Sequence, residues 1–363
     1  MLKTKEGEHS SIKYLKQYCK EVHSFPIPSD NNFFVLFKLI LGNLFSPLPF
    51  TAQKYYTNEM VNKIKVIISK SNIDIVHFDT LILAQFKNII PRTIPWVLVN
   101  HNVESILIRR RALKEKSILK ILYIYIQYLK LKKYERTNCP KAHANVVVSQ
   151  KDKEDLEIIA QNSRYYVVEN GVDTAYFNKQ GINKKKDILI MVGGWSWLPN
   201  YDSFKLFYHK IYPLIKKDIP NTILWIVGAN PTQDMLDIEK KDASVKIYGL
   251  VDDVRPLYEQ ASVFLVPLRI GGGTRLKILD ALSMEKSIVT TSIGCEGILV
   301  EDRVHLFIAD TPEDFAQKTI TLLKDEQLNE RLGKNGRKLM LEKYDWTLIG
   351  PKMEAVYKYA TRP

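Results

Sequence analysis

Cysteine is scarce in this sequence, and no motif is built on it. Cys19, Cys139 and Cys295 are scattered along the 363 residues and form no C-x-x-C pair. A disulfide framework and a cysteine-rich zinc site are therefore not indicated, and the pattern fits a reducing cytoplasm. The sequence also contains no Asp-x-Asp triplet and no H-E-x-x-H motif, so it gives no signature of a metal site.

Long apolar runs are missing as well. The most apolar early stretch, residues 33–45, contains Lys38 and is shorter than the ~20 apolar residues that a membrane-spanning helix needs. The start of the chain, MLKTKEGEHS, is polar and has no signal-peptide pattern. We therefore expect a cytoplasmic protein, whose contact with a membrane would be peripheral, on the inner face.

Acidic residues are outnumbered by basic ones. The chain has 53 Lys and Arg against 40 Asp and Glu, a net charge of +13 and a pI near 9.3. Such a balance favours an anionic partner, which could be a nucleic acid, an anionic lipid or a phosphorylated substrate. A lysine-rich bias of the whole proteome would give the same composition. No nucleic-acid-binding motif is present, so we expect no nucleic acid partner.

The sequence does contain two successive alternations of strands and helices. Apolar runs that suit strands buried in a parallel sheet occupy residues 73–78, 96–100, 144–148, 187–192, 222–228, 245–248, 262–266 and 287–290, and a short strand is expected at 21–27. Helical patterns separate these runs, and the polar GINKKK segment near residue 184 resembles a linker. We predict a first α/β domain over residues 1–178, a second over 179–343, and a helix over 344–363 that crosses back to the first.

The second domain is organised around residues 266–297. An apolar strand leads into Gly271–Gly273, and Arg275 and Lys277 follow at the start of a helical pattern. Glycine lets backbone amides approach a ligand closely, and the first turn of a helix favours an anion. Asp280 lies one helical turn after Lys277, on the same side, where it could accept hydrogen bonds from ribose hydroxyls. This pattern predicts a nucleoside diphosphate site, and the alternative is an ordinary glycine-rich turn of an α/β protein.

The segments GGGTRLKILDAL and SIVTTSIGCEGI resemble the donor site of retaining glycosyltransferases of family 4 (group 1), which have the GT-B fold. The resemblance implies two Rossmann-like domains that face a cleft and hold a nucleoside diphosphate (NDP) sugar. The family's signature is a pair of acids with seven residues between them. Asp280 matches the second acid, which binds ribose, whereas Gly272 stands where the first acid helps to hold the donor sugar. Compared with the family, the N-terminal domain is expected to lack its first βα unit.

The same resemblance assigns further residues. His101, in the HNVE segment after residues 96–100, matches a histidine beside the donor sugar, although an incidental histidine in a helix-capping segment is the alternative. The family usually places an Arg and a Lys after the strand at 187–192, where this chain has two tryptophans. Arg275 and Lys277 are therefore expected to neutralise the diphosphate. The remaining expected substrate-binding residues are Gly194, Gly249, Val251, Gly272, Gly273, Thr274 and Asp280.

The resemblance implies transfer of a sugar from an NDP-sugar to a saccharide or lipid-linked acceptor, with retention, in cell-surface polysaccharide or glycan biosynthesis. His101, Arg275 and Lys277 are the expected catalytic residues, and no metal or other cofactor is expected. Two alternatives stay open. One is a GT-B-like protein without transfer activity that binds nucleotide or supports a partner transferase. The other is a non-hydrolysing sugar-nucleotide epimerase.

One segment bears on the acceptor. Residues 106–134 mix basic residues with aromatic and aliphatic ones. They could lie on an anionic membrane surface and reach a lipid-linked acceptor. The alternative is two ordinary helices with solvated lysines.

Overall fold

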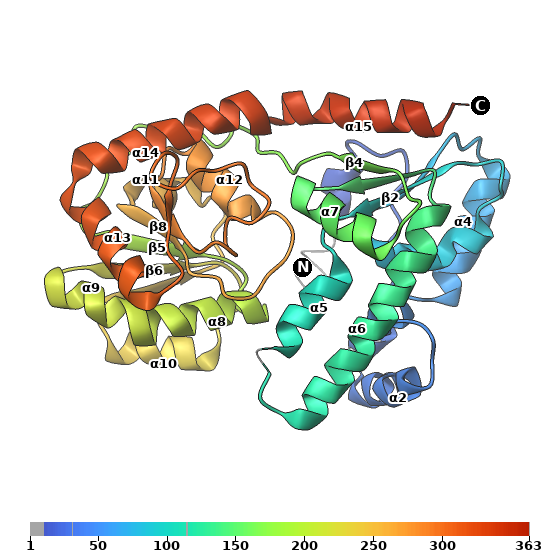
Figure 1. The fold of residues 1–363 in the computed structure, drawn as a ribbon, viewed down its shortest axis with the longest axis horizontal. Helices are drawn as coiled ribbons and strands as arrows, with labels where there is room; N and C mark the ends of the chain where they lie inside the picture. Colours follow the sequence, from blue (N-terminus) through green and yellow to red (C-terminus); the bar gives the residue numbers. More distant parts are fainter. Residues whose placement is uncertain (1–10, 31, 114, 363) are drawn as a thin grey trace. The chain divides into compact units, whose positions relative to one another are not determined.

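The computed structural model describes residues 11–30, 32–113 and 115–362 (Figure 1). The polar start at residues 1–10, for which no signal peptide was expected, lies outside this range. The chain divides into two compact units, of which the first comprises residues 1–73 and 85–93 and the second residues 74–84 and 94–363.

The first unit is helical. Its helices are η1 (Pro28–Asp30), α2 (Phe33–Leu44), α3 (Phe50–Lys54), α4 (Asn58–Lys70) and most of η2 (Leu81–Ile89). Asn32 begins α2 by accepting hydrogen bonds from the first amides of the helix, and Thr57 begins α4 in the same way. The strand predicted at 21–27 is wrong, because these residues, all of them described, contain no strand.

The second unit contains two parallel sheets, each with its own helices, which we call the first and second lobes. The first lobe has the strand order β1-β2-β3-β4, and the second lobe has the order β10-β9-β8-β5-β6-β7. The strands of the first lobe are β1 (Val76–Phe78), β2 (Trp96–Asn100), β3 (Ala144–Val147) and β4 (Tyr165–Val167). Those of the second lobe are β5 (Ile188–Val192), β6 (Ile223–Val227), β7 (Val245–Gly249), β8 (Val263–Val266), β9 (Ile288–Thr290) and β10 (Phe307–Ile308).

Helices cover both sheets. The first lobe carries α5 (Glu104–Ala112), α6 (Ile118–Asn138), η3 (Cys139–Lys141) and α7 (Gln150–Ile159). The second lobe carries α8 (Leu198–Leu206), η4 (Phe207–Ile211), α9 (Tyr212–Asp218), α10 (Gln233–Lys241), α11 (Arg255–Gln260), α12 (Leu276–Ser283), α13 (Pro312–Lys324), α14 (Glu326–Leu339) and η5 (Met340–Tyr344). The last helix, α15 (Trp346–Ala360), packs Ile349 and Val356 against Val97 and Val146 of the first lobe (Figure 1).

The central strand β5 shows why the second sheet is buried on both faces. Ile188 and Ile190 belong to one apolar cluster, with α11, α12 and α14, whereas Leu189 and Met191 belong to another, with α8, η4, α9 and α13. Successive side chains of a strand point to opposite faces, so a continuous apolar run is what a two-sided sheet requires. The strand order reverses beside β5, which has β6 on one side and β8 on the other. Ligands of open α/β sheets bind at the carboxyl ends of the strands at such a reversal.

Candidate active site

A cavity of about 500 Å³ opens at the carboxyl ends of β2 and β8, between the two lobes. Its walls are the first turn of α5, the loop after β5 and the loop that joins β8 to α12. The sequence-predicted residues that line it are His101, Gly272, Gly273, Thr274, Arg275 and Lys277. The structure thus brings together residues that lie about 170 positions apart in the sequence.

The backbone conformation and the close contacts of the loop explain why glycine stands at positions 272 and 273. Gly273 has φ +65°, and a Cβ built on it would lie 2.3 Å from the backbone oxygen of His101. A Cβ on Gly272 would lie 3.2 Å from Oδ1 of Asn102. The left-handed backbone and the close approach both favour glycine. The loop of the second lobe therefore rests directly on the segment that begins α5 in the first lobe.

Lys277 carries a positive charge into this region. Its Nζ donates to the carbonyl oxygen of Val192, 2.7 Å away at the end of β5, and to Oδ1 of Asn200, 3.0 Å away in α8. Within the described residues no carboxylate forms an ion pair with it. Burial, and then the nearby positive charge of Arg275, lower the pKa of Lys277 to about 8. A lysine from α12 thus supplies the cation beside the end of β5, where the loop itself carries tryptophans.

Arg275 is bound by its own loop. Its guanidinium donates to the carbonyl oxygens of Gly272 and Gly273 and, at 3.1 Å, to that of Ile293. Burial lowers the pKa of Arg275, but an arginine stays charged at any physiological pH. The side chain therefore fixes the shape of the glycine loop and places its charge behind it.

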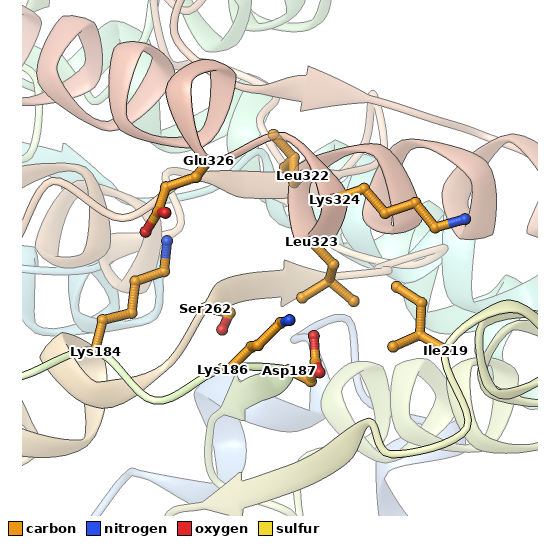
Figure 2. Close-up of a pocket in the computed structure, with 9 residues that line it drawn as sticks. All are labelled: Lys184, Lys186, Asp187, Ile219, Ser262, Leu322, Leu323, Lys324 and Glu326. Carbon is orange, nitrogen blue, oxygen red and sulfur yellow. The ribbon is translucent and has the colours of Figure 1, made fainter.

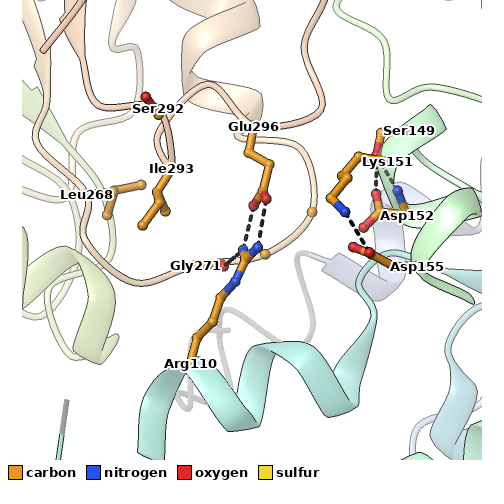
Figure 3. A network of polar contacts seen from close by, with 12 residues as sticks. Arg110, Ser149, Lys151, Asp152, Asp155, Leu268, Gly271, Ser292, Ile293 and Glu296 are labelled. Atoms are coloured by element: carbon orange, nitrogen blue, oxygen red, sulfur yellow. Dashed lines mark hydrogen bonds and ion pairs between the residues drawn. The ribbon is translucent and has the colours of Figure 1, made fainter. Parts of the chain in front are cut away.

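Arg110 connects α5 to the same loop (Figure 3). Its guanidinium forms a two-pronged ion pair with Glu296, with distances of 2.5 and 2.7 Å, and donates to the carbonyl oxygen of Gly271 at 2.8 Å. This contact could not be predicted from the sequence, because the two charged residues are separated by 186 positions. The ion pair bridges the two lobes beside the cavity.

The start of α12 is open to a ligand. No side chain caps its first turn, where the residue before the helix is Arg275. The hydroxyl of Thr274 is buried and has no hydrogen-bond partner among the described residues. Uncapped amides and an unsatisfied hydroxyl at a helix start are ready to bind an anion.

His101 belongs to a polar chain that the sequence did not reveal. Its Nε2 lies 3.1 Å from Asp79, in the loop after β1, and Asp79 is also 3.3 Å from His77. Nδ1 of His77 is in turn 2.6 Å from the hydroxyl of Tyr357 in α15. The hydrogen bond with Asp79 raises the pKa of His101, and the two histidines hold the pKa of Asp79 well below its usual range. Adjacent strands bring these residues together at the carboxyl edge of the first sheet.

The other predicted residues do not line the cavity. Gly194 accepts at its carbonyl oxygen from the Asn200 side chain, and Gly249 ends β7 with φ +65°. Val251 packs partly buried against the core of the second lobe. Asp280 lies on α12, where burial raises its pKa to about 7.

The two tryptophans after β5 take different positions. Trp195 is buried in the core and is only 1% exposed, whereas Trp197 is 58% exposed and lines the cavity. Packing in the core therefore describes Trp195 alone. Trp197 offers an aromatic face at the rim.

A larger cavity, of about 620 Å³, lies at the opposite end of the second sheet (Figure 2). It is lined by the residues that precede β5 and β8 and by the end of α13. Figure 2 shows Lys184 and Glu326 pointing toward one another, so that opposite charges face each other there. It opens where the strands begin, whereas ligands of open parallel sheets bind at the carboxyl ends of the strands.

The fold is similar to that of a solved glycosyltransferase structure. TarM of Staphylococcus aureus, in complex with fondaparinux, α-GlcNAc-glycerol and UDP, superposes with a TM-score of 0.66 at 15% identity, over 82% of this chain and 58% of that chain. The fold is therefore that of the GT-B glycosyltransferases, as the sequence predicted.

The family follows from two sequence models. Residues 186–325 match the model of group 1 glycosyl transferases, and residues 21–176 match that of glycosyltransferase family 4. The chain belongs to the family 4 (group 1) glycosyltransferases, and the resemblance noted at the glycine loop is confirmed.

Curated relatives are distant. An uncharacterized 44.6 kDa protein in the cps region of Klebsiella pneumoniae is 24% identical over 68% of this chain. A capsular polysaccharide biosynthesis glycosyltransferase of Staphylococcus aureus is 25% identical over 43% of this chain. The chain spans 64% and 40% of the lengths of these two proteins.

Within the described part of the chain, none of the helices combines the length and the apolar character that crossing a bilayer requires.

Proposed function

We propose that the protein transfers a sugar from an NDP-sugar to a saccharide or lipid-linked acceptor, with retention of configuration, in the synthesis of a cell-surface polysaccharide or glycan. One observation carries this proposal. Lys277, with no carboxylate ion-paired to it in the described residues, lies beside an uncapped helix start in a cavity at the carboxyl ends of two sheets. A diphosphate has the charge and the oxygen acceptors that this arrangement lacks.

The diphosphate would lie against the first amides of α12, with Lys277 and the Thr274 hydroxyl as donors. Arg275 would hold Gly272 and Gly273 in the conformation that exposes these amides. On the nucleoside side, Asp280 would accept from the ribose hydroxyls, and the backbone at Gly249 and Val251 would contact the base. Gly194 would let the loop after β5 approach the ligand.

The proposed chemical step takes its retention of configuration by analogy with the family. The acceptor oxygen forms a bond to the anomeric carbon on the face from which the bond to the phosphate oxygen breaks, and the acceptor proton passes to the departing phosphate. Negative charge grows on the diphosphate as that bond breaks. Lys277 and the α12 amides stabilise this charge more in the transition state than in the ground state, which is the condition for catalysis. His101, whose pKa the hydrogen bond with Asp79 raises, would add a donor on the sugar side of the cavity.

The relatives support the substrate classes. The staphylococcal relative is named for capsular polysaccharide biosynthesis, and the TarM structure contains UDP together with a sugar glycoside. A nucleotide-sugar donor and a saccharide acceptor are the substrates proposed by analogy for this chain.

An anionic membrane surface is the proposed second partner, on the inner face of the cell membrane. Leu113, Ile118, Leu119, Leu122 and Tyr125 are all exposed at the end of α5 and along α6, with side chains between 51% and 81% exposed. Arg109, Arg111, Lys116 and Lys120 are exposed on the same two helices and the loop between them. Apolar side chains ringed by basic ones are the composition of a surface that rests on anionic lipid headgroups.

The decisive experiment measures binding and transfer with a panel of UDP, GDP and ADP sugars. Calorimetry should register binding of at least one NDP, and the matching NDP-sugar should be consumed when saccharide or lipid-linked acceptors are present. Binding without consumption would favour the nucleotide-binding alternative that lacks transfer activity. No heat with any nucleotide would overturn the proposal.

A further inference from the structure

One wall of the cavity carries polar side chains that have no part in the proposed binding of the diphosphate. Beside the cationic glycine loop, its wall in the first lobe carries Glu104, Asn102 and Asn170. These side chains offer carboxylate and amide oxygens, which accept hydrogen bonds from hydroxyl groups. A ligand that fills the cavity must therefore be anionic at one end and rich in hydroxyls at the other.

Glu104 is the charged member of this wall. It is the first residue of α5, and the described residues provide no lysine or arginine in an ion pair with it. Its interactions are a hydrogen bond with the Asn102 side chain and the nearby charge of His101, while burial raises its pKa. A carboxylate with one amide partner keeps most of its acceptor capacity for a ligand.

The position of Glu104 is fixed by the helices around it. The next residue, Ser105, donates from its backbone N to Glu135 of α6 at 3.0 Å and from its hydroxyl to the same carboxyl group at 2.5 Å. Burial raises the pKa of Glu135 to about 7. The start of α5 is thus tied to α6, which holds the backbone that carries Glu104 in place at the wall of the cavity.

The opposite wall carries glycine where it faces α5. A Cβ on Gly272 would lie 3.2 Å from Oδ1 of Asn102 and 3.5 Å from Leu107, so a side chain at this position would require these neighbours to adjust. Among the residues that line the cavity, the acid is Glu104 of α5.

We infer that Glu104, positioned by Asn102, accepts hydrogen bonds from the hydroxyls of the donor sugar and so determines which NDP-sugar is bound. This inference rests on the proposed function, because it assigns the sugar end of the same cavity. In this proposal Arg275 and Lys277 serve the diphosphate of the NDP-sugar, and Glu104 binds the hydroxyls of its sugar. Trp197, on the rim of the same cavity, offers an apolar face against which the ring can pack.

The test compares NDP with NDP-sugar in one variant. Glu104→Gln keeps the shape of the side chain and removes its charge. It should weaken binding of the NDP-sugar by ~10- to 100-fold, as the loss of charge-assisted hydrogen bonds implies, and change the affinity for NDP itself by less than about twofold. Because NDP binding is measured on the same protein, it also reports whether the variant is folded. Glu157→Gln, on the exposed face of α7, is the control and should change neither affinity.

A second measurement identifies the hydroxyl. Donor analogues that each lack one sugar hydroxyl are titrated into the wild-type protein and into the Glu104→Gln variant. For the hydroxyl that Glu104 binds, the two losses should not add, because each change removes the same hydrogen bond.

The outcomes separate the two proposals. Equal loss of NDP and NDP-sugar affinity in the Glu104→Gln variant, or no loss of either, would overturn the role of Glu104 and leave the NDP site standing. Fully additive losses for every hydroxyl would overturn it as well. A wild-type protein that binds neither NDP nor NDP-sugar would overturn both proposals together.

Discussion

Lys277 is the residue on which the proposed chemistry depends most. It enters the cavity region from α12 and meets only a carbonyl and an amide oxygen at hydrogen-bond distance. A cation in that situation is costly in the empty protein and gains most when a diphosphate arrives. Its role therefore divides into two measurable parts, one in the transition state and one in the pH dependence of binding.

The first prediction concerns rate. Lys277→Ala should lower kcat by roughly 100- to 1,000-fold, the range found when one preorganised donor to a developing charge is removed, and weaken donor binding by much less. Steady-state kinetics with the NDP-sugar found active in the panel would separate the two effects. Lys210→Ala, an exposed lysine of η4, is the control. Equal losses in kcat and in donor affinity would contradict a role centred on the transition state.

The second prediction concerns pH. The pKa of Lys277 is about 8 in the free protein, and a bound diphosphate should raise it. Above pH 8 the free protein has lost a proton that the complex keeps, so binding takes up a proton and NDP affinity falls by up to about tenfold per pH unit. Calorimetry in buffers of different ionisation enthalpy measures this uptake. Lys277→Arg should abolish it, and an unchanged uptake in that variant would assign the proton to another group.

At the scale of elements, the clearest device is the bridge between α5 and the glycine loop. Arg110 contacts Glu296 and the carbonyl of Gly271 at once, so the helix of one lobe is joined to the ligand loop of the other. Both side chains are about one-quarter exposed, so the ion pair is partly screened. The ion pair should therefore contribute more to the position of the glycine loop than to the free energy of unfolding.

A double-mutant cycle tests this bridge. Arg110→Ala and Glu296→Ala should each weaken NDP-sugar binding, and the double variant should lose about 0.5–1 kcal/mol less than the sum, because either change alone breaks the same contact. The exposed pair Lys153 and Glu157 on α7, 3.8 Å apart, is the control cycle and should show no coupling. Additive losses for Arg110 and Glu296 would mean that the bridge does not act on the cavity.

Elements with strong apolar patterns could be predicted from the sequence, and weak ones could not. The run at 96–100 became β2 without a shift, because four consecutive apolar residues before Asn100 suit a fully buried strand. The two-residue strand β10 was missed, since it is too short to show any period. Residues 21–27 were predicted to form a strand but do not. Their mixed polar and apolar pattern offers no apolar face that could pack in a sheet.

The residues of the candidate site also divide into those that could be predicted from the sequence and those that could not. The glycine loop with Lys277 could be recognised because its residues are neighbours in the sequence. Asp79 and Glu296 could not be recognised, because each joins the site only when the chain folds and brings a distant residue beside it. Asp79 is 22 positions from its partner His101, and Glu296 is 186 positions from its partner Arg110. Glu104 lay within a segment singled out for its histidine, but only the shared cavity indicates what its carboxyl faces.

For the whole molecule, the net charge of +13 and the exposed apolar side chains of α6 both fit the proposed anionic membrane surface. Basic residues near an anionic surface contribute about 1 kcal/mol each, and each leucine that leaves water adds roughly 1.5–3 kcal/mol. A protein held by both effects binds anionic vesicles in a salt-dependent way and needs no helix that crosses the bilayer.

Flotation with lipid vesicles tests this. The protein should float with phosphatidylglycerol-containing vesicles at low salt, largely detach at high salt, and ignore neutral phosphatidylcholine vesicles, because screening removes the electrostatic attraction. The double variant Leu119→Glu and Leu122→Glu should bind at least about tenfold more weakly, since two apolar anchors are replaced by charges that the headgroups repel. Ile158→Glu, at a 76% exposed isoleucine of α7, is the matched control. Equal flotation of the double variant and the control would exclude α6 as the anchor, and the lysines would then be an ordinary solvated face.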